Sequence, residues 1–217
     1  MRSFLLLLAL FLAGPAQAVP TVTCHCFRDR EYDPGRPAGA DPYALATARN
    51  SLLAASFGLD KGEVVRALMT GTSPEDLWVS HWAAARLGGE AKGLRAARAE
   101  QGSWREALAA ASSARLGAPF SRALAAGGSD VVLADLAVDD VLASRLRVDV
   151  AALRALRQKG ATSPEAILGC LLAPRLRTPA PDLVARVRGG QTSWGALLAE
   201  AGLGPKDVEG ELRRALR

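Results

Sequence analysis

Thr72–Glu75 reads Thr-Ser-Pro-Glu, and Thr162–Glu165 repeats the same four residues 90 positions later. A second pair keeps this spacing, because Gln101–Trp104 and Gln191–Trp194 both read Gln-x-Ser-Trp. Two short motifs that share one offset indicate a diverged tandem duplication. The sequence therefore predicts two related units, and the architecture follows from what these motifs do locally.

Each repeated motif has the features of a helix start. In the first motif, a hydroxyl can cap the helix, the proline fixes φ, and the glutamate places negative charge at the positive helix end. In the second motif, a serine cap precedes a tryptophan whose ring can pack against the preceding helix. The residues that we expect to hold these repeated structural roles are Ser73, Pro74, Trp104, Ser163, Pro164 and Trp194.

The composition favours helices over sheets. Hydrophobic residues make up 49% of the 217 residues, but aromatic residues make up only 5%, and alanine and leucine dominate the apolar set. Alanine and leucine have high helix propensity, whereas sheets prefer β-branched and aromatic residues. We predict an all-α fold, either a helical-repeat bundle or a short solenoid of short capped helices.

The repeat also divides the chain. Residues 42–117 are expected to form the first copy and residues 149–217 the second, with connecting helices in residues 118–148. Within the connecting segment, Val131–Leu133 and Val138–Leu146 are apolar runs that fit either short helices or a strand. The two copies are expected to stack into one continuous array.

The positions of several helix ends can be predicted from capping residues and prolines. Asp41 is expected to cap a helix whose first residue is Pro42, since proline needs no hydrogen-bond partner there. One helix is expected over Trp104–Leu116. Asp139 and Asp140 are interpreted as cap and dipole partners at a helix start rather than as an acid–base pair.

The N-terminus has the pattern of a secretory signal peptide in residues 1–18. Arg2 supplies a positive charge, Phe4–Ala13 an apolar segment, and Ala16–Ala18 a small-residue cleavage site. Ten apolar residues are too few to cross a bilayer, which needs roughly 20. We expect cleavage near Ala18, an exported protein in the periplasm or outside the cell, and no membrane span in the mature chain.

Residues 19–41 form an irregular leader that contains Cys24, His25 and Cys26. In an oxidising compartment a disulfide is the default use of cysteine, so Cys24 or Cys26 could pair with Cys170 and close a loop of about 145 residues. The alternatives are a strained Cys24–Cys26 bond, thiols that stay unpaired, or a zinc or copper site that uses Cys24, His25, Cys26 and Cys170.

Sequence motifs for known catalytic chemistries are missing. The chain has no Gly-x-Ser-x-Gly elbow, phosphate loop, dinucleotide fingerprint or His-Glu-x-x-His zinc helix. We therefore predict no catalytic residue and, apart from the zinc or copper alternative, no cofactor. His81 lies between Trp78 and Trp82 and is interpreted as a half-buried packing residue.

The charge distribution bears on partners. Residues 142–217 hold 13 basic and 7 acidic side chains, whereas residues 19–141 hold 13 and 15. The excess fits either a solvated helical surface or contact with anionic lipid, peptidoglycan or an acidic partner. Nucleic acid is not expected as a partner of an exported protein.

Arg188–Gly195 resembles a motif of uncharacterised exported bacterial proteins with short helical repeats, Leu-x-x-x-x-Gly-x-[Gly/Ser]-Trp-[Gly/Ala]. Ala99–Arg105 is a degenerate match. The resemblance implies helical repeats and export but no activity. We expect a non-enzymatic binding or scaffolding component of the bacterial cell envelope, with an envelope protein as partner. The alternative is a periplasmic metal- or thiol-handling protein that uses Cys24, His25 and Cys26.

Overall fold

The computed structural model describes residues 27–217, and this part of the chain is helical without strands, which confirms the all-α prediction. The helices are α1 (Asp41–Phe57), α2 (Lys61–Met69), α3 (Pro74–Leu87), α4 (Ala91–Gln101), α5 (Trp104–Ala107), α6 (Ser113–Leu116), α7 (Ala118–Ala125), α8 (Asp130–Arg145), α9 (Val150–Gln158), α10 (Ser163–Leu176), α11 (Ala180–Arg188), α12 (Trp194–Glu200), the 3-10 helix η1 (Pro205–Asp207) and α13 (Val208–Ala215).

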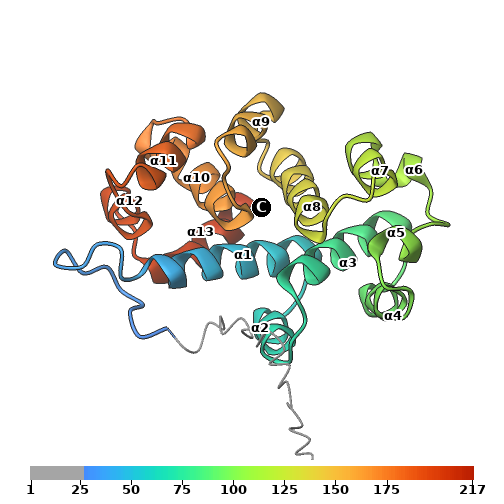
Figure 1. Cartoon of the computed structure of the whole chain (residues 1–217). Helices are drawn as coiled ribbons and strands as arrows, with labels where there is room; N and C mark the ends of the chain where they lie inside the picture. The colour runs from blue at the N-terminus through green and yellow to red at the C-terminus, as the bar shows by residue number, and fades with distance from the viewer. Residues whose placement is uncertain (1–26) are drawn as a thin grey trace, which may run out of the picture.

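Helix α1 runs across the molecule, and α3 continues in a similar direction (Figure 1). Helices α10, α12 and α13 pack on α1, whereas α8, α4 and α6 pack on α3. The buried positions of α1 are mostly small residues, such as Ala44 and Ala48, and include two leucines, Leu52 and Leu53. Small residues let neighbouring helices approach closely, as the alanine-rich composition suggested. None of the helices in residues 27–217 has the length and apolar character needed to cross a membrane.

The first repeated motif starts a helix in both places, but not in the same way. Ser73 caps α3, because its Oγ accepts the N–H of Asp76 at 2.9 Å. In α10 the cap position is one residue earlier in the motif, because Ser163 is already the first helical residue. Thr162 takes the cap position, and the carboxylate of Glu165 accepts both its N–H at 2.8 Å and its hydroxyl at 2.7 Å. The hydroxyl of Ser163 is thus available for a tertiary contact.

The second repeated motif starts a helix with a buried indole in both copies. Trp104 and Trp194 are 1% and 2% exposed. Their serine caps accept backbone N–H groups at 3.2 Å in α5 and 3.1 Å in α12. The single helix expected over Trp104–Leu116 is wrong, however. The chain turns after α5 and forms the separate helix α6, and Leu108 and Leu116 are both buried.

The apolar runs of the connecting segment form one long helix, α8, so the strand alternative is wrong. Asp139 and Asp140 lie in its interior and not at a helix start, which overturns their interpretation as caps. Their charges are balanced by other helices instead: Asp139 pairs with Arg157 at 2.7 Å and Asp140 with Arg86 at 2.5 Å. These partners are distant in sequence, so the local sequence pattern around the two aspartates could not identify them.

Asp41 does not cap its own helix as predicted, because it is the first residue of α1. Its carboxylate accepts the N–H of Trp194 at 3.1 Å and that of Gly195 at 2.7 Å. In addition, the Oγ of Ser193 donates to the carbonyl of Pro37 at 2.7 Å. The first residue of α1 and the segment before α1 therefore bind the start of α12, and the two parts of the chain are joined there.

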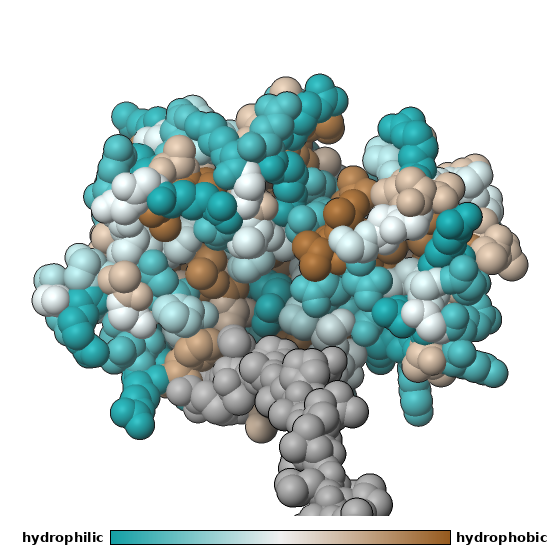
Figure 2. All heavy atoms as spheres, in the orientation of Figure 1, coloured by the Kyte–Doolittle hydropathy of each residue, from teal (hydrophilic) through white to brown (hydrophobic). Residues whose placement is uncertain are grey.

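The surface is mostly polar, with a small apolar patch where α8 begins (Figure 2). Val131 and Val132 are 56% and 45% exposed at this point. Elsewhere in residues 27–217, exposed large apolar side chains are scattered singly, as at Met69 and Val150. Single exposed residues are normal for a folded protein, whereas adjacent ones next to a cavity call for an explanation.

Candidate functional site: a polar cavity between four helices

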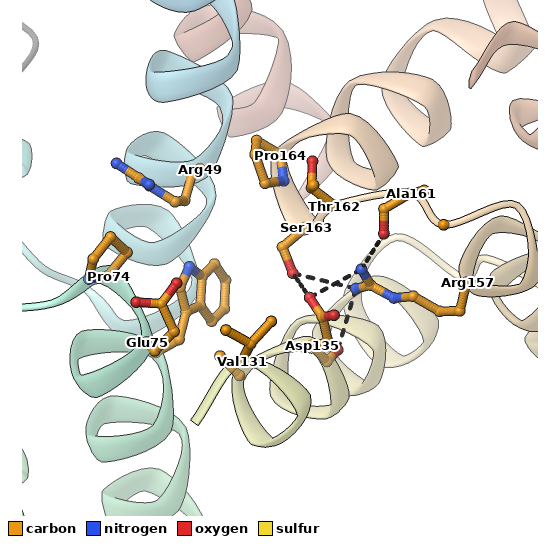
Figure 3. Close-up of a pocket in the computed structure, with 13 residues that line it drawn as sticks. Arg49, Pro74, Glu75, Val131, Asp135, Arg157, Ala161, Thr162, Ser163 and Pro164 are labelled. Carbon is orange, nitrogen blue, oxygen red and sulfur yellow. Dashed lines mark hydrogen bonds and ion pairs between the residues drawn. The ribbon is translucent and has the colours of Figure 1, made fainter. Parts of the chain in front are cut away.

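A cavity of about 390 Å³ lies where the starts of α3 and α10 face α1 and α8 (Figure 3). The prolines of the repeated motif, Pro74 and Pro164, both line it. Its volume is within the range of about 300–1,000 Å³ that is usual for small-molecule sites. The two copies of the Thr-Ser-Pro-Glu motif thus meet at one place, and we take this cavity as the candidate site.

One wall of the cavity is a closed polar network. The guanidinium of Arg157 pairs with Asp135 at 2.9 Å and with Asp139 at 2.7 Å, and it donates to the carbonyl of Ala161 at 2.9 Å. The hydroxyl of Ser163 donates to the Asp135 carboxylate and accepts from Arg157 at 3.2 Å. Dashed lines in Figure 3 mark the contacts of Arg157 with Asp135, Ala161 and Ser163 and the contact of Ser163 with Asp135. The groups on this wall satisfy one another, so this wall is rigid and needs no ligand.

The opposite wall carries charges that the network does not reach. Figure 3 places Arg49 of α1 and Glu75 of α3 on the same side of the cavity, across from Arg157. Arg49 is half-buried, and its Nε donates to the Oδ1 of Asn50 at 3.2 Å. Glu75 is also half-buried, but within residues 27–217 its carboxylate has neither a hydrogen bond nor an ion pair. Glu75 is thus an acceptor without a donor.

Trp78 also lines the cavity and carries the clearest anomaly of the described chain. Its side chain is 2% exposed, and its indole Nε1 is buried without a hydrogen-bond partner. By contrast, Trp82 donates to Asp140 at 2.9 Å and Trp104 donates to Asp76 at 3.0 Å. A buried donor left unpaired costs about 1–3 kcal/mol. The unpaired donor therefore belongs to a residue that lines the cavity.

The rim of the cavity is apolar on the α8 side. Val131 lines the cavity and is 56% exposed, so it lies between the cavity and solvent. Ala134, one helical turn further along α8, is 6% exposed and lines the cavity as well. The cavity therefore combines a charged wall, a satisfied polar wall and an apolar rim.

The predicted ligand cluster lies largely outside this site. Cys24, His25 and Cys26 are outside the described residues, so their metal or disulfide chemistry stays a prediction. Cys170 is half-buried on α10 and forms no disulfide in the described part of the chain. Burial, and then the nearby Asp139 carboxylate, raises the pKa of Cys170 to about 12. Cys170 is thus a thiol at neutral pH.

His81 is half-buried on α3, as expected for a packing residue. Its ring stacks on Phe57 with centroids 6.2 Å apart, and the Arg95 guanidinium approaches its Nε2 to 3.4 Å. Burial, reinforced by the charge of Arg95, lowers the pKa of His81 to about 4. Within residues 27–217, no three His, Cys, Asp or Glu side chains are grouped so as to hold a metal ion.

Most residues that line the cavity could not be identified as a site from the sequence. Glu75 lies in a repeated motif, but its charge was expected only to interact with the helix dipole. The sequence pattern indicated no role in a site for Trp78, Arg49 or Arg157. One signal was available: Asp135 and Asp139 are four residues apart, which puts both carboxylates on one helix face.

Comparisons with known proteins do not add a function to this geometry. Conclusions about function therefore depend on the residues of this chain alone. No family model matches the sequence, and neither the curated proteins nor the solved structures give a significant match.

Proposed function

We propose that this protein is a non-enzymatic, exported binding protein of the bacterial cell envelope that takes a small polar ligand into the cavity. The observation that carries the proposal is the buried, unpartnered indole N–H of Trp78 beside the unpaired carboxylate of Glu75. Folded proteins pair roughly nine in ten buried polar groups or more. Unpaired groups on one wall of a cavity are best explained by a ligand that pairs them.

The lining supports binding rather than catalysis. Its one serine, Ser163, donates its hydroxyl proton to Asp135 and accepts from Arg157, so the hydroxyl serves a structural network. Neither a histidine nor a cysteine is among the described residues that line the cavity. A nucleophile activated by a neighbouring base is the usual signature of covalent catalysis, and this wall is not built that way.

Export is proposed from the sequence of residues 1–18, with Arg2, Phe4–Ala13 and Ala16–Ala18 as the features that support it. An envelope location would place the ligand among the small molecules of that compartment or on the end of an envelope component. The metal- or thiol-handling alternative depends on Cys24, His25 and Cys26, and it is kept as a separate proposal from the sequence.

We also infer that the repeated unit is larger than the motifs suggested and comprises α1–α5 and α8–α12. Helix α1 begins at Asp41 and α8 at Asp130, an offset of 89 residues. Gly71 and Gly160, which follow α2 and α9 with positive φ, have the same offset. On this inference the second copy begins near residue 130, so part of the connecting segment belongs to it.

The packing of these units gives a reason for the position of the cavity. The first helix of each unit packs on the third helix of the other, α1 on α10 and α8 on α3. This exchange brings the two repeated helix starts, at Pro74 and Pro164, to face one cavity. A duplication that creates a site at the junction between its copies supports a binding function for that junction.

The test is whether blocking the cavity removes ligand binding. The Val131→Trp substitution adds bulk at the exposed rim and should leave the core intact, and Val150→Trp is the control because Val150 is 60% exposed outside the cavity. Each purified protein is incubated with a protein-free, low-molecular-mass extract of the cell envelope and examined by native mass spectrometry. We expect a bound small molecule on the wild type and on Val150→Trp but not on Val131→Trp. Equal occupancy in all three proteins, or none, would contradict the proposal.

A further inference from the structure

A second hollow, which we call the α4 cleft, lies where the end of α1, the middle of α3, the start of α4 and the end of α8 come together. Its volume is about 650 Å³, and it shares no lining residue with the candidate site described above. Three cationic side chains line it, Lys92, Arg95 and Arg145, against one carboxylate, that of Glu90. Because His81, which also lines the cleft, is neutral at pH 7, the lining side chains carry a net charge of +2.

Two of the three cations are exposed. Within residues 27–217 the ammonium of Lys92 forms neither a hydrogen bond nor an ion pair. The guanidinium of Arg145 has no acid partner in this part of the chain and donates to the carbonyl of Ser56 at 3.4 Å. Solvated cations are common on protein surfaces. These two residues therefore set the sign of the α4 cleft but do not by themselves make it a site.

Arg95 is the unusual member, because its charge is half-buried without an ion pair in the described chain. Its Nη1 donates to the Oγ of Ser80 at 2.8 Å and approaches the Nε2 of His81 to 3.4 Å, and both of these partners are neutral. Burial lowers the pKa of Arg95, and the charge of Asp76 opposes this effect. Charged side chains that leave solvent are normally paired with an opposite charge. Arg95 lacks such a partner.

Two acids near Arg95 have other partners. Asp76 accepts from the indole of Trp104 at 3.0 Å. Glu63 of α2 lines a smaller cavity together with Arg95, but its carboxylate lies 4.0 Å from Arg66. The Nε and Nη2 of Arg95 have no partner in residues 27–217, and neither is a buried atom. One edge of the guanidinium is therefore open for two parallel hydrogen bonds to an oxyanion.

The second half of the chain shows that helix packing does not require an arginine at this place. Helices α3 and α10 have 14 residues each, and α10 begins 89 residues after α3, as α11 does after α4. On the inferred repeat, Ser80 corresponds to Gly169 and Arg95 to Val184. Val184 is fully buried, and a Cβ at Gly169 would lie 3.5 Å from it. An apolar contact thus joins α10 to α11 where a cation joins α3 to α4.

The lining indicates a phosphate monoester as the ligand. Such a group carries about −1.5 to −2 charges at pH 7 and so balances the lining, whereas a carboxylate carries only one. An arginine edge fits two phosphate oxygens, and a lysine adds a compact charge. The start of α4 adds backbone N–H groups, because no side chain caps it. Glu90 is exposed, and nothing in the described chain holds its carboxylate in the cleft.

The size of the α4 cleft indicates an organic phosphate rather than the free ion. Its volume of about 650 Å³ is within the usual range for small-molecule sites and is much larger than a phosphate ion needs. Phe57, Ala84 and Ala91 also line it and can contact the organic part of the ester. The same phosphate group occurs on soluble glycerol and sugar phosphates and on the headgroup of phosphatidic acid.

We propose that the α4 cleft binds the phosphate group of a phosphate monoester, with this group on Arg95, Lys92 and Arg145. This site does not depend on the proposed function, since the two cavities share no residue. Binding at one of them can therefore be disproved while binding at the other stands.

The experiment is a calorimetric titration of the purified full chain with glycerol 3-phosphate, and acetate is the single-charge control. In a second arm the protein is sedimented with phosphatidylcholine vesicles that contain or lack phosphatidic acid. We expect glycerol 3-phosphate to bind and acetate to bind at least ten-fold more weakly. Binding to phosphatidic acid vesicles alone would identify a lipid headgroup as the source of the same group. Absence of binding in both arms at millimolar phosphate, or equal binding of acetate, would overturn the proposal.

Two substitutions and a control locate the binding. Arg95→Val introduces the residue that α11 carries at the corresponding position, and we expect a loss of affinity of about ten-fold or more. Lys92→Gln should also weaken binding without a change in melting temperature, because Lys92 is exposed and unpaired. Arg122→Val is the matched control, since Arg122 is exposed on α7 outside the cleft. Unaltered affinity in either cleft variant, or an equal loss in the control, would contradict the proposal.

His81 provides a readout that is specific for the α4 cleft. Its pKa is lowered to about 4 by burial and then by the charge of Arg95, and a bound phosphate would offset this charge. We therefore expect saturating glycerol 3-phosphate to raise the pKa of His81 in a ¹H NMR titration. The chain has two histidines, so a His81→Gln variant assigns the signal. An unchanged pKa of His81 in the presence of bound phosphate would place the ligand elsewhere and overturn the proposal.

Discussion

Asp41 caps a helix that begins more than 150 residues later: its Oδ1 accepts the backbone N–H of Gly195 at 2.7 Å, across a separation of 154 residues. The same carboxylate also accepts the N–H of Trp194. The start of α1 and the start of α12 therefore stabilise each other. This contact joins the N-terminal segment of the described chain to its second half.

The Asp41→Ala substitution should destabilise the protein by about 1–3 kcal/mol, because it leaves two half-buried N–H groups without an acceptor. Asp41→Asn should cost less, since an amide oxygen can still accept one bond. Urea denaturation measures both effects, and Asp33→Ala in the exposed preceding loop is the control. If Asp41→Ala is no more harmful than the control, the cap contributes nothing to stability.

Replacing single tryptophans should distinguish a paired indole from an unpaired one. Trp78 and Trp104 are both almost completely buried, but only Trp104 donates to a carboxylate, that of Asp76 at 3.0 Å. Trp104→Phe should cost about 1–3 kcal/mol, because it breaks this charge-assisted bond. Trp78→Phe removes a donor that has no partner and should cost distinctly less.

Thermal or urea unfolding of the two variants, in the absence of added ligand, makes this comparison. Similar losses would mean that the Trp78 N–H is already paired with another group in solution. That result would remove the observation on which the proposed binding site depends.

The folded protein should become less stable in mild acid, because His81 binds a proton more readily in the unfolded chain. Its pKa is lowered to about 4 in the folded protein, mainly by burial, from an ordinary value near 6.5. Between these values the unfolded chain binds a proton that the folded protein does not, so the free energy of unfolding decreases as pH falls from 6.5 towards 4. We expect a loss of about 2 kcal/mol from this residue, allowing for its partial exposure to solvent.

The matched variant for this prediction is His81→Gln, which cannot titrate. Melting temperatures of both proteins are compared at pH 7.5, 5.5 and 4.5. The difference between wild type and variant should change with pH in favour of the variant under acid conditions. A difference that is independent of pH would show that His81 does not carry the effect.

Local features of the helix starts could be predicted from sequence, and long-range features could not. The capping of α3 by Ser73 depends on the next three residues only, and so does the pairing of Thr162 with Glu165. The roles of Asp41 and Asp139 depend on Gly195 and Arg157, which reach them only after folding. The sequence therefore predicts where helices begin better than what their charged residues do.

The cavity could not be predicted from the sequence, for the same reason. Its walls come from four helices, and whether Glu75 and Trp78 are paired depends on how these helices pack. The repeat was nonetheless informative, because Pro74 and Pro164 proved to line one cavity. Equal spacing in the sequence indicated which segments to compare, although it did not indicate their chemistry.

The thiol chemistry gives a separate prediction. Because its pKa is about 12 and its side chain is half-buried, Cys170 should react slowly with a thiol reagent in the folded protein and quickly after unfolding.

The purified wild type and a Cys24→Ser, Cys26→Ser double variant are compared by thiol counting and elemental analysis. Stoichiometric zinc or copper that the double variant loses would favour the metal-handling alternative over the binding proposal.

The most direct test of the binding site is the indole N–H resonance of Trp78 in a ¹H–¹⁵N NMR spectrum. The chain has four tryptophans, and the Trp78→Phe variant assigns the relevant signal. On addition of the low-molecular-mass extract of the cell envelope, we predict a saturable shift of the Trp78 signal, because Trp78 lines the cavity, while the signal of Trp104, already bonded to Asp76, stays in place. A Trp78 signal that does not move with the extract would contradict the proposed binding site.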